Sequence, residues 1–206
     1  MNRPTGTSVV NRSSPRGQAY TLEAIIAGML VISALIFALQ VTAVTPLSAS
    51  TSSQHIENQQ KATAEGVLAA AQEDGNLKDG LLFWNNTAGA YYDAERRMFY
   101  TNTYPDNEFG AILDRSFAGR GLAVNVAIYP EDGGRPLYMV NRGTPSDNAV
   151  TASTSVTIYS DDNLTAPGFD DVTVEEADTF HDRIPESEGP GTVHNVVRVE
   201  VTVWRM

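Results

Sequence analysis

The side chains that most often carry out catalysis are scattered in this sequence. It contains no cysteine, which excludes thiolate nucleophiles, thiolate metal ligands and disulfides. Its three histidines, His55, His181 and His194, stand apart and lack the His-Glu-x-x-His spacing of a zinc site. A Gly-x-Ser-x-Gly elbow, a P-loop and a dinucleotide-binding glycine motif are absent as well. A serine and a carboxylate from distant segments can still meet in a fold. The better-supported prediction is a protein that is not an enzyme.

Carboxylates gather in residues 160–191, SDDNLTAPGFDDVTVEEADTFHDRIPESEGPG, which we expect to form a long acidic loop. Their oxygens are of the type that Ca²⁺ prefers. The candidates are Asp161, Asp162, Asp170, Asp171, Glu175, Glu176 and Asp178. They lack the spacing of an EF-hand, so the simpler interpretation is a solvated acidic surface, with calcium as the alternative. No other cofactor is expected.

Two segments have the spacing of an N-glycosylation site. Asn85-Asn86-Thr87 and Asn163-Leu164-Thr165 both fit the Asn-x-Ser/Thr pattern. Asn85 and Asn163 are therefore candidate glycosylation sites, provided that this part of the chain is exported.

One apolar stretch dominates the organisation of the chain. Residues 24–44 are mostly Ala, Ile, Leu, Val, Met and Phe, and no ionisable side chain lies between Glu23 and His55. About 20 residues of helix, at a rise of roughly 1.5 Å each, cross a bilayer core of about 30 Å. A helix also satisfies its own backbone hydrogen bonds in lipid. The sequence predicts a single transmembrane helix over residues 18–45.

Charged residues flanking this stretch predict its orientation. Arg3, Arg12 and Arg16 precede the span, and the next basic residue is Lys61. The positive-inside rule places the N-terminus in the cytoplasm and the C-terminal domain outside the cell membrane. Glu23 stands at the mouth of the span, where a carboxylate is costly. A helix N-terminus would recover only about 0.3–1 kcal/mol of that cost, and a simple anchor does not need this residue.

The segment Arg16-Gly17-Gln18-Ala19-Tyr20-Thr21-Leu22-Glu23 and the apolar helix after it resemble the class III signal of type IV prepilins and archaeal pilin-like proteins. The resemblance implies that a prepilin peptidase cuts between Gly17 and Gln18 and leaves the helix on the mature subunit. That cut makes Glu23 the sixth mature residue, whereas the family usually has its glutamate at the fifth. A cut after Gln18 restores the spacing but loses glycine at the scissile position.

The resemblance, which is best over residues 16–74, also implies a function. The new α-amino group of one subunit would pair with Glu23 of its neighbour in a bundle of helices. Expected partners are other pilin-like subunits, the prepilin peptidase, the pilus assembly machinery and the membrane. The expected function is that of a non-enzymatic, minor pilin-like subunit of a type IV pilus-like surface structure. The alternative is an uncut single-pass anchor that carries an extracellular binding or adhesion module.

Composition indicates where such a protein works. The formal net charge is −11, and only 2 of the 14 basic residues are lysines, Lys61 and Lys78. This balance disfavours nucleic acid as a partner, because the protein repels phosphate. It is typical of a halophilic protein with an acidic surface, in line with the resemblance to haloarchaeal pilin-like proteins. An ordinary acidic extracellular protein is the alternative.

The remaining chain is predicted to divide into three parts around the span. Residues 1–17 form a basic disordered leader, residues 46–75 an amphipathic stalk helix, and residues 77–206 an extracytoplasmic β-rich head. Pro46 predicts a kink or a local break after the span. The stalk helix should end at Gly75 in a left-handed cap. Its apolar face is expected to contain Ile56, Thr63, Val67, Ala70 and Ala71.

Short apolar runs between turn residues predict the strands of the head. The clearest cover residues 122–129, 136–141, 150–159 and 193–204, the last two with alternating apolar and polar residues. Shorter aromatic strands are expected at 81–84 and 97–100. A short amphipathic helix should lie between Asp106 and Gly119, with Asp106 as its N-cap. The expected fold class is α+β: a long N-terminal transmembrane and stalk helix packed on a mainly antiparallel, pilin-like β head.

Overall fold

The computed structural model describes residues 15–95, 98–131, 133, 135–187 and 192–206, with the backbone alone for residues 15–19 and 41–53. The chain forms two compact units, Met1–Ser53 and Gln54–Met206. The second, called the folded unit below, contains the sheet and its hydrophobic core.

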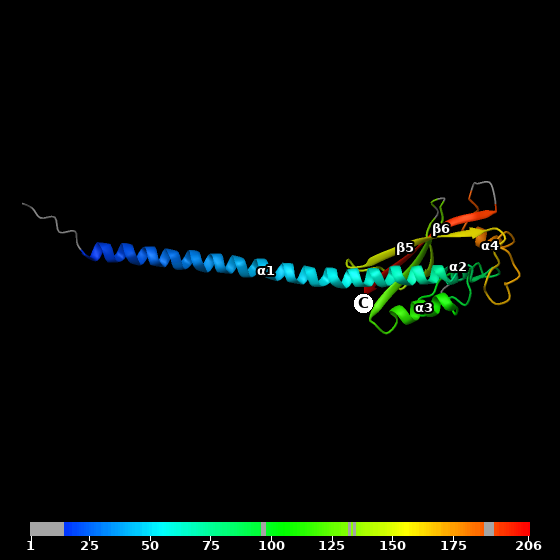
Figure 1. Cartoon of the computed structure of the whole chain (residues 1–206), viewed down its shortest axis with the longest axis horizontal. Helices are drawn as coiled ribbons and strands as arrows, with labels where there is room; N and C mark the ends of the chain where they lie inside the picture. Colours follow the sequence, from blue (N-terminus) through cyan, green and yellow to red (C-terminus); the bar gives the residue numbers. More distant parts are fainter. Residues whose placement is uncertain (1–14, 96–97, 132, 134, 188–191) are drawn as a thin grey trace, which may run out of the picture. The chain divides into compact units, whose positions relative to one another are not determined.

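Helix α1, Pro15–Glu73, takes in the predicted span and the predicted stalk (Figure 1). It is helical at Pro46, so the local break allowed by the sequence does not occur. A proline removes one backbone hydrogen bond but keeps a φ angle that suits a helix. The disorder predicted for residues 1–17 is wrong for Pro15, Arg16 and Gly17, which are helical. Proline is favoured at the first helical position. Residues 1–14 lie outside the described residues.

The C-terminal end of α1 is defined by Gly75. This glycine has a φ angle of 78°, the left-handed conformation that the sequence predicts. The chain then turns directly into a second helix, α2, Asn76–Leu81, which the sequence did not predict. Helix α2 buries Leu77, Gly80 and Leu81 in the core.

Within the folded unit, α1 presents one apolar face to the core. Ala64, Val67, Leu68 and Ala71 are buried on this face, and Ile56 and Thr63 are half-buried. The predicted face is therefore confirmed for most of its positions. Ala70 is exposed, and this position was predicted wrongly: its neighbour Ala71 faces the core, and α1 turns by about 100° between successive residues.

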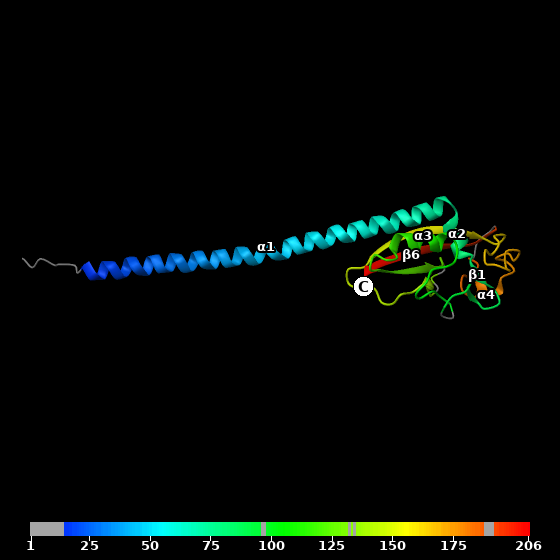
Figure 2. The same cartoon turned by 90° about the horizontal axis from the view of Figure 1, so that it is seen from below.

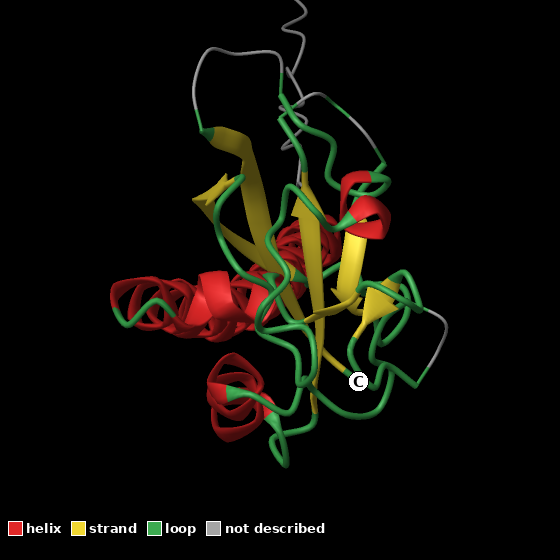
Figure 3. Cartoon of the chain, turned by 90° about the vertical axis from the view of Figure 1, so that its right-hand side faces the viewer, coloured by secondary structure: helices red, strands yellow, loops and turns green. Residues whose placement is uncertain are grey.

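A four-stranded antiparallel sheet forms the centre of the folded unit, in the order β4-β3-β6-β5 (Figure 3). The strands are β3 (Leu122–Tyr129), β4 (Leu137–Val140), β5 (Val150–Tyr159) and β6 (Val193–Arg205). All four were predicted to within a residue or two of these bounds. The mixed helix and antiparallel sheet confirm the α+β class.

Strand β6 shows how the sheet divides into two faces. Val197, Val199, Val201 and Val203 have no solvent exposure, whereas the alternating residues from Val196 to Thr202 are less buried. The buried face lies against α1, because Thr154 of β5 donates a 2.6 Å hydrogen bond from Oγ1 to Oε1 of Gln72. Helix α3, Glu108–Phe117, covers the sheet from the same side as α1 (Figure 3).

Helix α3 has a different N-cap from the one predicted. The Asn107 side chain accepts a 2.9 Å hydrogen bond from the Gly110 backbone N–H, so Asn107 is the cap and Asp106 is not. Both residue types cap helices well, and the sequence alone does not decide between neighbours. Phe109, Leu113 and Phe117 then face the core, with no solvent exposure.

The two short aromatic strands were predicted only in part. Residues 76–81 form α2, and the strand β1 is Trp84–Asn85, paired with β2, Ala90–Tyr91. Tyr100 forms an isolated parallel bridge with Val140. Short apolar runs do not distinguish a strand from a buried helix by periodicity, which explains the error.

We expect Gly110→Ala to destabilise the folded unit. A Cβ atom on Gly110 would lie 1.8 Å from the carbonyl oxygen of Pro105, so the backbone before α3 would have to move. Overpacking of this kind costs about 1–3 kcal/mol. The measurement is urea unfolding of the full chain in detergent, followed by circular dichroism. The matched control is Gly66→Ala in α1, where no atom lies within 4 Å of the new Cβ and a gain of about 0.8–1 kcal/mol is expected. Similar effects at both positions would contradict the prediction.

Candidate functional site

The apolar part of α1 is a large surface that nothing in the described fold covers. Residues Tyr20–Gln40 are long and apolar enough to cross a membrane, and this is the one such helix among the described residues. None of the 21 residues is buried. The large apolar side chains there are all at least half exposed: Tyr20, Leu22, Ile25, Ile26, Met29, Leu30, Val31, Ile32, Leu35, Ile36, Phe37 and Leu39.

These side chains lie all around the helix rather than on one stripe. Runs such as Met29–Ile32 and Leu35–Phe37 cover every direction within a turn of about 3.6 residues. A helix that is apolar on all sides belongs in lipid or in a bundle. Exposure of a large apolar side chain to water costs about 1.5–3 kcal/mol. The segment therefore needs a membrane, other helices, or both.

Glu23 is the one residue with a carboxylate in this surface. It is exposed and lies about two turns into α1, because the helix begins at Pro15. The macrodipole acts only on the first turn of a helix, and α1 has no acidic residue there. In the uncut chain Glu23 therefore lies beyond the reach of the helix N-terminus, so the macrodipole recovers none of the cost of its burial. Arg16, Gly17 and Gln18, the predicted processing residues, lie in the helical backbone just before this surface.

The acidic residues of the predicted loop are spread over a structured segment. Residues 160–187 contain helix α4, Asp178–His181, and bury Leu164, Val174, Phe180 and Ile184 in the core. The segment is therefore not an irregular loop throughout, although every predicted carboxylate except Asp162 is exposed, as the interpretation of a solvated acidic surface expects. Asp162 pairs with Lys78 at 2.6 Å. Among the described residues, no three acidic or histidine side chains are placed to hold a metal ion.

A hydrogen-bonded network attaches this segment to the β1–β2 turn. The Thr179 hydroxyl accepts a 3.1 Å hydrogen bond from Nε1 of Trp84 and lies 2.8 Å from the carbonyl oxygen of Asn86. Of the two candidate glycosylation sites, Asn163 is exposed. Asn85 is half-buried, and its Oδ1 accepts the backbone N–H groups of Thr87 and Ala88.

Two of the three histidines meet in the fold, although they are far apart in the sequence. The rings of His181 and His194 lie 4.5 Å apart in an edge-to-face arrangement. His194 is fully buried, with Nε2 bonded to the carbonyl oxygen of Ile184 at 2.7 Å and Nδ1 without a partner. His55 is exposed. Sequence reasoning missed this pair because the contact joins α4 to β6. Among the described residues no third ligand joins the pair.

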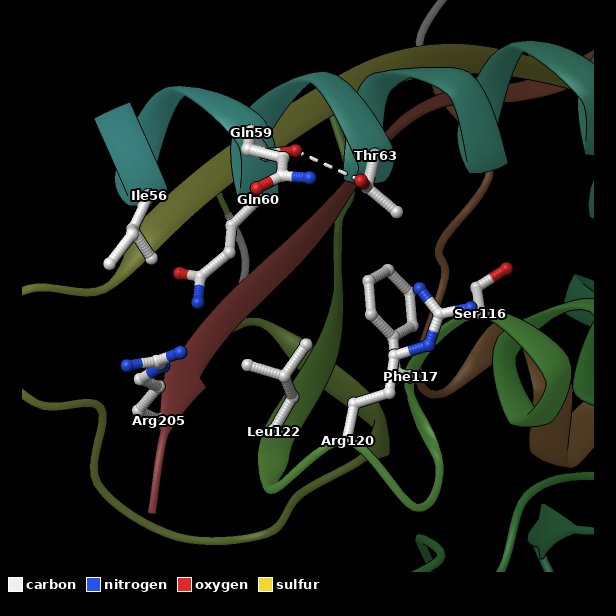
Figure 4. Close-up of a pocket in the computed structure, with 9 residues that line it drawn as sticks. All are labelled: Ile56, Gln59, Gln60, Thr63, Ser116, Phe117, Arg120, Leu122 and Arg205. Carbon is white, nitrogen blue, oxygen red and sulfur yellow. Dashed lines mark hydrogen bonds between the residues drawn. The ribbon is translucent and has the colours of Figure 1, made fainter. Parts of the chain in front are cut away.

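One hollow of the described surface, beside Met98 and Leu137, is lined by Arg135, Asp182 and Arg183. Two further hollows mark the folded unit. One lies on the open face of the sheet beside Tyr129, Tyr138 and Thr202. Its asparagine, Asn125, already donates to the Gly143 carbonyl and accepts from the Arg142 N–H. The other is a cavity of about 210 Å³ between α1, the end of α3 and the last residue of β6 (Figure 4). It contains two arginines, Arg120 and Arg205.

Comparison with known proteins identifies a family but no activity. A family of unknown function (DUF7288) matches residues 16–203, which include α1, the sheet and the acidic segment. No curated protein and no solved structure matches the chain.

We expect the folded unit to lose stability as the pH falls below about 6.5. Burial, which disfavours the charged ring, lowers the pKa of His194 from its ordinary value of 6.5, and the neighbouring His181 lowers it further. A hydrogen bond to the Ile184 carbonyl and the charge of Glu186 oppose this shift. Between the lowered folded pKa and 6.5 the unfolded chain binds the extra proton, so acidification favours unfolding.

The measurement is the unfolding midpoint of the full chain between about pH 7.5 and pH 5, a range that brackets the ordinary histidine pKa, for the wild type against His194→Phe. The variant should lose most of the slope in the acidic half of that range, whatever its stability at the basic end. His55→Gln, at an exposed position, should keep the wild-type slope. An unchanged slope in His194→Phe would show that other groups determine the acid response.

Proposed function

We propose that this chain, which belongs to the family of unknown function DUF7288, is a membrane-anchored, non-enzymatic subunit that resembles type IV pilins. Its α1 helix would assemble with the same helix of other copies or related subunits into a surface structure, in which this chain is a minor component. The N-terminus would lie in the cytoplasm and the folded unit outside the cell, in a salt-rich setting.

One observation carries the proposal: an all-round apolar helix that contains a single carboxylate. Lipid alone would satisfy the apolar side chains from Tyr20 to Gln40. It would not satisfy Glu23, because a charge in hydrocarbon costs several kcal/mol unless it is paired. A partner group inside a bundle of such helices removes that cost, which is the reason to favour assembly over a solitary anchor.

The resemblance to the prepilin signal suggests which group pairs with Glu23. A cut between Gly17 and Gln18 creates an α-amino group five residues before Glu23. Within one helix these groups are more than one turn apart, so the amine and the carboxylate pair more readily between neighbouring copies. The α-amino group of each copy would then pair with Glu23 of one neighbour, and its own Glu23 would pair with the α-amino group of another. This pairing repeats along a bundle. The prepilin peptidase and assembly machinery are proposed partners on the same ground.

The folded unit supports a structural role. The described acidic segment does not assemble a metal site, and the buried histidine pair has no access to solvent at His194. The uncut anchor with a binding module is the competing proposal, and it makes the opposite prediction about the leader.

We expect the protein isolated from membranes to begin at Gln18 or Ala19, and Glu23→Ala to weaken association between copies. Loss of one partner of a buried ion pair costs about 3–5 kcal/mol, so association should fall at least about a hundredfold. The measurements are intact mass and the yield of copy-to-copy cross-links in membranes. Glu73→Ala, at an exposed position near the end of α1, is the matched control and should assemble normally. A start at Met1 or Asn2 with normal assembly of Glu23→Ala would support the uncut anchor instead.

A further inference from the structure

The cavity that contains Arg120 and Arg205, called the arginine cavity below, has the chemistry of a binding site for carboxylates. Its walls come from α1, the end of α3 and the end of β6. Figure 4 shows Gln60 of α1 extending toward Arg205, with Leu122 and Phe117 on the opposite wall. Guanidinium, amide and hydroxyl donors thus share a hollow of about 210 Å³ with apolar surface.

The charge of the arginine cavity is unbalanced. The chain has 25 acidic residues, yet none lines this cavity. Three ion pairs are formed among the described residues, and none includes Arg120 or Arg205: they are Lys61–Glu65, Lys78–Asp162 and Arg198–Glu200. Arg120 and Arg205 are both exposed, so in a protein of net charge −11 their guanidinium groups are available to a carboxylate of another molecule.

We propose that the arginine cavity binds the acidic segment, residues 160–187, of a second copy of this chain. Exposed carboxylates on that segment are close together in the sequence: Asp170, Asp171, Glu175, Glu176 and Asp178. A guanidinium group binds a carboxylate through two parallel hydrogen bonds, which gives such a contact both strength and direction. This proposal rests on the proposed assembly function and adds a contact between folded units to the contact between helices.

The cavity and the acidic segment lie at opposite ends of the folded unit. In the β5–β6 ladder, Val150 pairs with Val203 near the cavity, and Tyr159 pairs with Val193 beside the segment. Ten residues of strand β5 span about 33 Å at roughly 3.3 Å per residue. Figures 1 and 2 show the C-terminus, next to Arg205, at one end of the folded unit and α4 at the other.

A contact between opposite ends is heterologous, and it leaves a free cavity on one copy and a free acidic segment on the other. Such contacts repeat and produce open arrays unless the rotation closes them into a ring. The same array geometry is required of a filament subunit. Within one molecule, the distance along the sheet prevents the segment from reaching its own cavity.

Disulfide cross-linking tests the contact directly, because the chain has no cysteine of its own. Ser116→Cys places a thiol on the wall of the arginine cavity, and Glu175→Cys places one on the exposed acidic segment. Both substitutions together, in the full chain in its native membrane, should give an oxidised ladder of dimers, trimers and larger species. Each substitution alone should give no species larger than a dimer.

Matched variants separate this contact from helix assembly. Arg120→Gln with Arg205→Gln should reduce the ladder at least about tenfold, as expected when bidentate guanidinium contacts are lost. Arg135→Gln, which changes an exposed arginine outside the cavity, should leave the ladder unchanged. The substitution Leu30→Cys, in the apolar helix, reports helix bundling independently.

The outcomes distinguish this proposal from the proposed function. Cross-links from Leu30→Cys without a ladder from the paired Ser116→Cys and Glu175→Cys substitutions would overturn this proposal and leave the proposed function standing. Loss of both kinds of cross-link would overturn both. If the thiol introduced by Ser116→Cys is protected from a thiol reagent but no ladder forms, the cavity has another occupant, such as a lipid phosphate, and the proposal is also overturned.

Discussion

The fold depends on one packing constraint: the sheet has an apolar face that the end of α1, α2 and α3 cover. Val199 and Val201 of β6 are fully buried on that face. Ala64 and Ala71 of α1 are fully buried as well, and their small side chains allow the helix backbone to approach the strands closely. An antiparallel sheet with one uncovered apolar face is not stable in water. The C-terminal turns of α1 are therefore part of the core, and the folded unit includes them.

The two parts of α1 differ in how their apolar side chains are distributed around the helix. Residues 54–73 alternate between a buried face and a charged face that contains Glu65 and Lys61, as expected for a helix on a sheet in water. Residues 20–40 have no polar face, so no position on the folded unit's surface would satisfy them on all sides. One continuous helix thus joins a water-stable core to a segment that requires lipid or other helices. This composition is compatible with membrane attachment, and attachment alone would not explain a carboxylate at Glu23.

The sequence predicts those elements whose pattern of residues lies within one continuous segment. Strand β3 is a mostly apolar run of eight residues, strands β5 and β6 have ten or more residues with alternation, and Gly75 is a glycine at a position that requires a positive φ angle. The parts that were missed depend on contacts between distant segments. Helix α2 forms because Leu77 and Leu81 meet a core built later in the chain, and the acidic segment is structured because Phe180 packs between Trp84 and His194. The arginine cavity was also invisible to the sequence, because Arg120 and Arg205 are brought together only when β3 pairs with β6.

The net negative charge of the folded units does not prevent a contact at the arginine cavity, because the repulsion and the contact act over different distances. Repulsion between acidic folded units acts over the Debye length, which is about 10 Å at 0.1 M salt and about 3 Å at 1 M. Salt therefore removes the long-range repulsion that would keep copies apart. A guanidinium and a carboxylate in direct contact are separated by no more than about that length, and such contacts retain their hydrogen bonds when bulk salt is high. In the proposed contact, a surface with many carboxylates and few arginines would disfavour most other contacts between copies, which would give the contact its specificity.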